Sequence, residues 1–241
     1  EPMTGESMGE SAERMAKENG ISRTDQDFWA LRSHQLAAAA TKDGRLPSEI
    51  APLYVPQNFE TVIETDNGIR TETNEQELAK LRPAFDLRHG SVTAGNASPL
   101  TDGAAGVILM SEERVKADGV KPLGYVRSYA FAGLDPRGQL LQGPAYATPI
   151  ALDRARVTMA DIGLMEMHEA FAAQVLGCCK ELGLSGDDER LNPNGGAIAV
   201  GHPLGASGVR LALTGLRQLE RINGRYALIS LCIGIGQGVA M

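Results

Sequence analysis

The strongest constraint on the fold is a glycine-rich stretch at residues 192–207, which reads Asn-Pro-Asn-Gly-Gly-Ala-Ile-Ala-Val-Gly-His-Pro-Leu-Gly-Ala-Ser. Three of its glycines permit a positive φ or a close approach of the backbone to another group: Gly195, Gly196 and Gly201. Pro203 fixes the turn after His202, and a helix pattern follows at residues 208–221. The stretch predicts a histidine held on a stiff turn beside the positive end of a helix dipole, although Gly-His-Pro alone is also typical of an ordinary solvent-facing turn.

A second unusual stretch begins with a continuous apolar run at residues 226–231, which predicts a strand buried on both faces. Cys232 ends this strand, and glycines follow at alternate positions up to Gly238. A thiol beside bare backbone N–H groups suits the handling of protons and oxyanions, whereas the simpler interpretation is a small buried cysteine in a turn. A dinucleotide-binding fingerprint at residues 234–236 is discarded because no helix pattern follows it.

Four motifs occur in the order in which the thiolase family carries them. They are Thr-Ala-Gly-Asn-Ala-Ser at residues 93–98, His-Glu-Ala-Phe at residues 168–171, the stretch around His202, and Cys-Ile-Gly-Ile-Gly-Gln-Gly at residues 232–238. The chain resembles thiolases over nearly its whole length. The histidine at position 168, where most thiolases have asparagine, and residues 139–149 most resemble the β-subunit of the fatty-acid β-oxidation trifunctional enzymes.

Strand and helix patterns alternate along the chain, which predicts a layered α/β fold with the site on loops at strand ends. The resemblance implies a thiolase-like α/β/α sandwich with an incomplete N-terminal domain. We expect a loop domain that covers coenzyme A at residues 1–100, the last strand and helix of the N-terminal domain at residues 101–121, and the C-terminal domain at residues 122–241.

Local signals predict the individual elements. Two helices are expected within residues 8–40, the first ended by Gly20 and the second capped by Ser22 or Thr24. His34, on the second of these helices, is interpreted as a surface or packing residue. Strands are expected at residues 53–55, 102–110 and 121–131, helices at residues 75–81, 111–118, 147–154 and 169–182, and a loop at Gly-Pro-Ala-Tyr, residues 143–146.

The resemblance assigns roles to five residues. His202 suits the base that activates a cysteine nucleophile, because imidazole accepts a thiol proton near neutral pH. Cys232 suits the acid that protonates the departing enolate. By resemblance, His168 positions a water in an oxyanion hole, Gly234 offers a backbone N–H to a second oxyanion, and Ser98 contacts the pantetheine arm of coenzyme A, although a turn of small residues would explain Ser98 equally well.

The nucleophile itself is missing. Thiolases carry it in a Cys-Ser-Ser or Cys-Ala-Ser type motif, which this chain lacks. Cys178 and Cys179 lie in a helix pattern and are interpreted as core residues. The start at Glu1-Pro2 has neither an initiator methionine nor a signal-peptide pattern, so we expect a C-terminal portion of a thiolase that is inactive by itself.

The function expected for the complete enzyme is that of an acyltransferase, a 3-ketoacyl-CoA thiolase of fatty-acid β-oxidation. The alternatives are a biosynthetic acetoacetyl-CoA thiolase and a non-catalytic thiolase-like module that binds coenzyme A or a partner. Coenzyme A is expected as a substrate, with no permanent cofactor and no metal. A homodimer is expected, with a hydratase–dehydrogenase α-subunit as a possible partner, in the bacterial cytoplasm or the mitochondrial matrix.

Charge and hydropathy bear on the other possible partners. The net charge of −7 argues against nucleic acid, because an acidic surface repels a polyanion. No apolar run reaches the roughly 20 residues that a membrane-spanning helix needs. Three cysteines form no disulfide framework and suit a reducing compartment.

Overall fold

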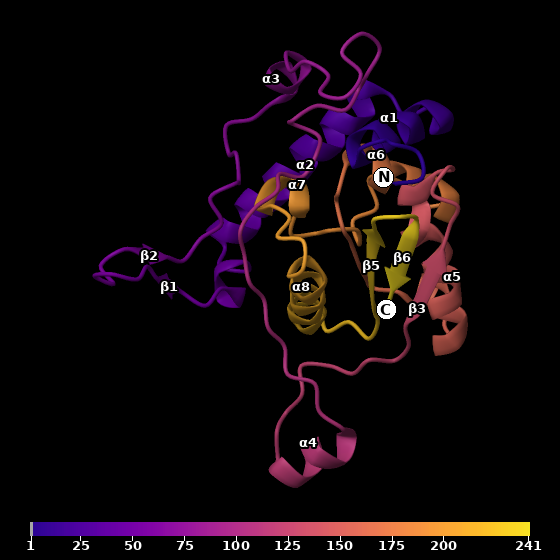
Figure 1. Cartoon of the computed structure of the whole chain (residues 1–241). Coiled ribbons are helices and arrows are strands. Elements are labelled where there is room, and N and C mark those ends of the chain that lie inside the picture. The colour runs from indigo at the N-terminus through magenta and orange to yellow at the C-terminus, as the bar shows by residue number, and fades with distance from the viewer. Residues whose placement is uncertain (1) are drawn as a thin grey trace.

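A four-stranded mixed sheet organises the C-terminal half of the computed structural model, which describes residues 2–241 (Figure 1). Its strands are β3 (Ala130–Gly133), β4 (Leu164–Met167), β5 (Ala227–Ile233) and β6 (Gln237–Ala240), in the spatial order β3-β6-β5-β4. β4 and β5 are parallel, whereas β6 runs antiparallel to both of its neighbours. The expected α/β fold is confirmed.

Helices cover both faces of this sheet. α8 (Ser207–Arg221) approaches one face so closely that a Cβ added at Gly215 would lie 2.5 Å from Ile229 of β5. Leu228, which points to the opposite face because side chains alternate along a strand, packs in the main core with residues of α5 (Gly143–Ala155). α6 (Ala172–Leu182) and the short helix α7 (Ala197–Val200) follow β4 in the chain.

The two N-terminal helices are α1 (Met8–Asn19) and α2 (Arg23–Lys42), as the sequence predicts. Gly20 ends α1 with the left-handed φ of 64°, and Ser22 caps α2 through a capping box with Asp25. α1 packs on α6, and α2 packs on α7 and α6. His34 is buried on α2, where its Nδ1 accepts a hydrogen bond from the Arg70 backbone, so its interpretation as a packing residue is confirmed.

Several smaller elements lie away from the sheet. A hairpin of β1 (Leu53–Tyr54) and β2 (Val62–Ile63) projects from the body, and α3 (Glu75–Ala79) follows it (Figure 1). α4 (Glu112–Asp118), a predicted helix whose N-terminus is capped by Ser111, lies at the far end of two long extended segments. Short 3₁₀ helices occur at η1 (Pro47–Glu49), η2 (Leu140–Gln142) and η3 (Met159–Asp161).

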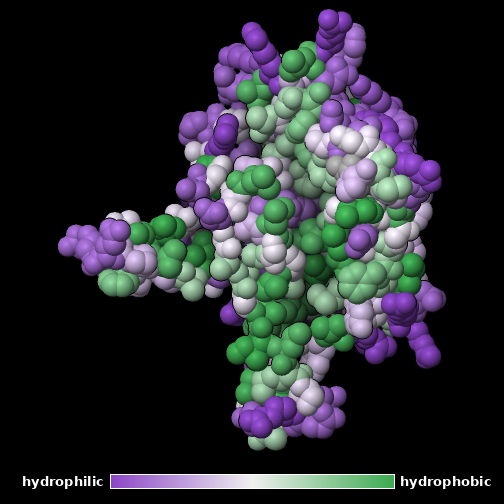
Figure 2. All heavy atoms as spheres, in the orientation of Figure 1, coloured by the Kyte–Doolittle hydropathy of each residue, from purple (hydrophilic) through white to green (hydrophobic). Residues whose placement is uncertain are grey.

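The predictions for the segments that flank α4 are wrong in part. Residues 102–110 form no strand, and only the last two residues of the strand expected at 121–131 belong to β3. Residues 102–110 and residues 121–129 pair with no strand within residues 2–241, so the backbone there extends without forming a ladder. Apolar side chains there face solvent: Ile108 is 89% exposed and Leu109 is 81% exposed. Figure 2 shows hydrophobic surface over this lower part of the molecule.

Other corrections concern helix boundaries and burial. Gly-Pro-Ala-Tyr is the first turn of α5 rather than a loop, with Pro144 at a position where proline fits the start of a helix. The helix expected at residues 169–182 begins only at Ala172. β5 buries one face, but Ile229 and Leu231 on the other are only partly buried. Among residues 2–241, no helix is long and apolar enough to cross a membrane, and no histidine, cysteine and carboxylate side chains cluster to hold a metal.

Candidate active site

The structure brings His168 and His202 together, with ring centroids 3.9 Å apart and ring planes inclined by 50°. His168 follows β4 directly, and its backbone N–H extends the ladder to Ser230 of β5 at 2.9 Å. His202 follows the short helix α7, so the expectation that it lies at a strand end is wrong. Two residues 34 positions apart thus meet as an imidazole pair beside the sheet.

The His202 loop is held in place on several sides. The Nδ1 of His202 lies 2.6 Å from Ser207 Oγ at the start of α8, and the His202 backbone N–H donates to the Pro99 carbonyl at 3.0 Å. The preceding Gly201 has a φ of 97°, and a Cβ there would lie 2.6 Å from the Thr101 side chain. Only glycine fits this conformation and this space, which explains the Gly-His pair predicted to form a stiff turn.

The environment of His202 favours the neutral imidazole. The ring is half-buried, and this burial, together with the nearby charge of Arg210, lowers its pKa. A neutral imidazole can accept a proton, which is the state that a general base needs at the start of a reaction.

His168 is more deeply enclosed, with 1% of its surface exposed. Burial lowers its pKa well below the ordinary value, and the charges of His202 and Arg210 add to this effect. Neither ring nitrogen has a hydrogen-bond partner among the described residues. Buried polar atoms of this kind are usually satisfied by an internal water, which agrees with the water-positioning role that the resemblance implies.

A short extended segment at residues 97–100 lies against both histidine loops. Both the backbone N–H and the hydroxyl of Ser98 donate to the Ala170 carbonyl, at 3.0 and 3.1 Å. Leu100 forms an isolated bridge with His202, and Ala97 forms another with Phe171. Ser98 is therefore next to the site, although the contact with pantetheine stays a prediction.

Cys232 lies near the end of β5, opposite Gly238 of β6. It is two positions beyond Ser230, whose carbonyl accepts the His168 N–H, so it lies one strand away from the histidine pair. Burial raises the pKa of its thiol to about 12, which keeps the thiol protonated as a proton donor requires. Gly234 belongs to the turn between β5 and β6, where Ile235 and Gly236 have positive φ values of 67° and 77°.

Sequence reasoning assigned no role to two buried carboxylates near the pair. Glu166 of β4 is fully buried, and burial raises its pKa to about 8 even though Arg210 Nη1 lies 3.8 Å away. Glu169 is fully buried and accepts hydrogen bonds from three segments of the chain. Both acidic residues stand in an otherwise apolar part of the sequence, and Glu169 also belongs to the His-Glu-Ala-Phe motif.

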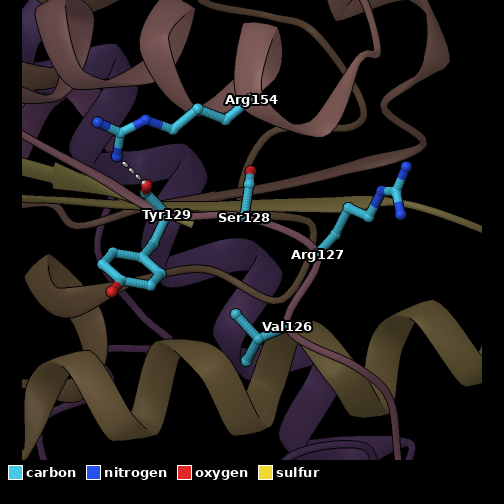
Figure 3. Close-up of a pocket in the computed structure, with 5 residues that line it drawn as sticks. All are labelled: Val126, Arg127, Ser128, Tyr129 and Arg154. Carbon is cyan, nitrogen blue, oxygen red and sulfur yellow. Dashed lines mark hydrogen bonds between the residues drawn. The ribbon is translucent and has the colours of Figure 1, made fainter.

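An open hollow between α5 and residues 126–129 is lined by none of the predicted site residues (Figure 3). Arg154 donates to the Tyr129 carbonyl at 2.6 Å, and Arg127 donates to the Ala155 carbonyl at 3.3 Å. Both guanidinium groups therefore satisfy backbone acceptors, and we assign the hollow no part in the chemistry.

Two family models match the chain. Residues 1–113 match the family model of the thiolase N-terminal domain, and residues 120–241 match that of the thiolase C-terminal domain. The chain belongs to the thiolase family. The division at residues 100 and 121 stays a prediction.

Individual proteins of this family are similar to the chain over nearly its whole length. The chain is 50% identical over 253 aligned residues to the 3-ketoacyl-CoA thiolases of Yersinia pestis and Yersinia pseudotuberculosis, an alignment that covers 99% of this chain and 58% of theirs. It also superimposes on the crystal structure of the Bacillus anthracis acetyl-CoA acetyltransferase with a TM-score of 0.95 at 40% identity, covering 99% of this chain and 60% of that one. The chain thus spans about three fifths of the length of these relatives.

Proposed function

We propose that the protein takes part in the thiolytic cleavage of 3-ketoacyl-CoA by coenzyme A, which yields acetyl-CoA and a shortened acyl-CoA. The observation that carries this proposal is the contact of His168 with His202, together with the position of Cys232 on β5, the strand that pairs with β4 just before His168. The relatives named 3-ketoacyl-CoA thiolase support the same reaction.

The first half-reaction forms an acyl-enzyme. His202 takes the proton of a nucleophilic thiol, and the thiolate attacks the C3 carbonyl carbon of the substrate. The bond between C2 and C3 then breaks, the acyl group stays on the nucleophile, and the electron pair leaves with the acetyl-CoA enolate. Cys232 gives its proton to C2 of this enolate. The neutral His202 and the protonated Cys232 described above are the states that this sequence needs.

The second half-reaction releases the shortened product. The Cys232 thiolate takes the proton of an incoming coenzyme A thiol, which attacks the acyl carbonyl, and the nucleophile leaves with the proton held by His202. A water on His168 and the N–H of Gly234 support the oxyanions that develop on the carbonyl oxygens.

The nucleophile comes from sequence outside these 241 residues. Cys178 and Cys179 are buried in α6, with 0% and 2% of their surfaces exposed. Burial raises the pKa of each thiol to about 12, so neither supplies a thiolate near neutral pH. We therefore expect the isolated 241 residues to show no turnover.

The direction of the reaction has two candidates. The 50% identity to 3-ketoacyl-CoA thiolases supports a role in fatty-acid β-oxidation. The Bacillus anthracis relative is named acetyl-CoA acetyltransferase, which supports a biosynthetic role in the condensation of two acetyl-CoA molecules. We favour β-oxidation because the identity to the first group is higher and residues 139–149 resemble enzymes of that pathway.

The test begins with the intact mass of the purified protein, followed by thiolysis assays with acetoacetyl-CoA and a longer 3-ketoacyl-CoA. Turnover by a protein heavier than the 25.6 kDa of this sequence supports the proposal, and a preference for the longer substrate supports β-oxidation. A heavier protein without thiolysis of either substrate contradicts the proposal, and the non-catalytic coenzyme A-binding module then becomes the better account.

A further inference from the structure

Glu169 is a fully buried carboxylate that directly follows His168 and takes no part in the proposed chemistry. Its Oε2 accepts hydrogen bonds from Ser33 Oγ at 2.7 Å and from the Ile198 backbone N–H at 3.1 Å. Its Oε1 accepts a hydrogen bond from Asn192 Nδ2 at 3.0 Å. A buried carboxylate is costly unless donors surround it, so this arrangement fixes the side chain in one place.

The donors to Glu169 come from three separate segments. Ser33 belongs to α2, Ile198 belongs to α7, and Asn192 follows the bridge between Leu191 and Met165 of β4. Ser33 Oγ also accepts a hydrogen bond from the Gly196 backbone N–H at 3.0 Å, so α2 and the start of α7 meet on the same carboxylate.

Gly196 explains how the backbone can come this close. A Cβ at this position would lie 2.4 Å from Cδ of Glu169, which is nearer than real side-chain contacts allow. The second glycine of the Asn-Gly-Gly motif therefore makes room for the carboxylate, a role distinct from the positive φ of Gly195.

Only a few residues separate Glu169 and its hydrogen-bond donors from the two imidazoles. α7 leads directly into Gly201 and His202, and the Gly201 N–H donates to the Ala197 carbonyl at 2.9 Å. His168 is the residue immediately before Glu169. One side chain thus restrains the backbone next to the first histidine and the helix that precedes the second.

We infer that Glu169, held by Ser33 of α2, is a positioning residue that fixes His202 against His168. The inference rests on the proposed function, in which these two histidines act. It also connects α2, part of the predicted coenzyme A-covering domain, to the loop that carries the base.

The first test uses nuclear magnetic resonance on the 241-residue chain and needs no turnover. Glu169→Gln replaces one acceptor oxygen by an NH₂ group, which leaves at least one of the three donors without an acceptor. We expect faster amide hydrogen exchange at Ile198, and shifted or doubled ring signals for His202 and His168. Unchanged ring signals and unchanged exchange at Ile198 overturn the inference.

Glu13→Gln is the matched control. Glu13 of α1 is also buried, at 3% exposure, and accepts backbone hydrogen bonds from Ser91 and Val92 at 2.7–2.9 Å. We expect this variant to lower thermal stability while the His202 signals stay in place. If both variants move the histidine signals equally, Glu169 is a general structural residue and the inference fails.

Ser33 supplies a milder pair of variants that tests the inference even if Glu169→Gln does not fold. Ser33→Ala removes one donor to Glu169, whereas Ser33→Thr keeps the hydroxyl. We expect Ser33→Ala to move the His202 signals and Ser33→Thr to restore them. Equal His202 spectra for the unmodified chain and Ser33→Ala contradict the inference.

Activity in the full-length protein gives a separate readout. A displaced base slows chemistry more than binding, so we expect Ser33→Ala to lower kcat at least about tenfold while KM changes less than about twofold. A change in KM alone overturns the positioning role. If the unmodified full-length protein shows no thiolysis, the proposed function fails, and the resonance experiment still decides whether Glu169 holds the histidine loop.

Discussion

His168 and His202 face each other with their ring centroids 3.9 Å apart, in a site where neither ring is fully open to solvent. Two protonated imidazoles at this separation would repel each other, and burial opposes each charge separately. Both imidazoles are therefore neutral near pH 7, and a proton on one of them would oppose protonation of the other.

This neutrality predicts how stability depends on pH. The folded pKa of His168 lies below its unfolded value of 6.5, so its stabilising contribution is full above pH 6.5 and decreases as the pH falls, because the unfolded chain binds the proton. The loss reaches up to about 1.4 kcal/mol per pH unit. Urea denaturation should show a shallower decrease below pH 6.5 for His168→Asn than for the unmodified chain. Equal slopes would show that His168 is not held neutral.

The contribution of Glu166 to stability changes with pH in the opposite direction. Its folded pKa of about 8 lies above the unfolded value of 4.5, so its contribution is full below pH 4.5 and is lost as the pH rises towards 8. In Glu166→Gln this loss is absent. The unfolding free energy of the variant, relative to the unmodified chain, should rise by roughly 1.4 kcal/mol per pH unit within that window. A difference that is constant from pH 5 to pH 8 would mean that Glu166 is ionised throughout, paired with Arg210.

Gly201 and Gly205 lie in the same loop but differ in what a methyl group would meet. Gly201 has a φ of 97° and lies against Thr101, whereas a Cβ at Gly205 has nothing within 4 Å. Gly201→Ala should destabilise the fold by roughly 2 kcal/mol or more and disturb His202. Gly205→Ala should change stability by less than about 0.5 kcal/mol. Comparable denaturation midpoints for the two variants would contradict the strain assigned to Gly201.

The exposed apolar segment before α4 predicts association in water. Ile108 and Leu109 are among the most exposed large hydrophobic side chains that the structure describes. Surfaces of this kind favour contact with another chain. The double variant Ile108→Lys, Leu109→Lys should shift the 241-residue chain towards monomer in analytical ultracentrifugation.

The control for this experiment adds the same two charges elsewhere. Thr71, which precedes α3, and Gln76, which lies on α3, are exposed polar residues. The double variant Thr71→Lys, Gln76→Lys should therefore leave association unchanged. If the unmodified chain is monomeric at all concentrations tested, the segment does not drive association.

Local signals allowed the N-terminal helices to be predicted. The capping box of Ser22 with Asp25 and the left-handed glycine after α1 depend on residues a few positions apart, which the sequence displays directly. Helix α4 was predicted for the same reason, because Ser111 caps its first turn.

The strands beside α4 could not be predicted in this way. An apolar run shows that a segment needs to be covered, but a strand forms only where a second backbone supplies hydrogen bonds. Residues 102–110 have the apolar pattern, but no other strand within residues 2–241 lies beside them. The helix start at Gly-Pro-Ala-Tyr was missed, and the close packing of its Gly143 on Gln237 and Gly238 joins residues distant in sequence.

The same distinction applies to the candidate site. His168, His202 and Cys232 belong to motifs that the sequence shows, and the structure places the two histidines in contact. Glu169 was visible in the His-Glu-Ala-Phe motif, but its contact with Ser33 spans 136 positions and needs the fold to bring it about. The protonated state of Cys232 likewise follows from its burial, which a local sequence pattern does not predict.

The strand order β3-β6-β5-β4 also has a consequence for how the protein is made. Both outer strands, β3 and β4, are translated before either inner strand, so each leaves the ribosome with no partner in the sheet. β6 hydrogen-bonds to β3 and β5 at once, and β3 therefore stays unpaired until residues 237–240 have emerged. The sheet that carries Cys232 and orients His168 therefore assembles only after residues 227–240 have emerged, when β5 and β6 pair with the two outer strands.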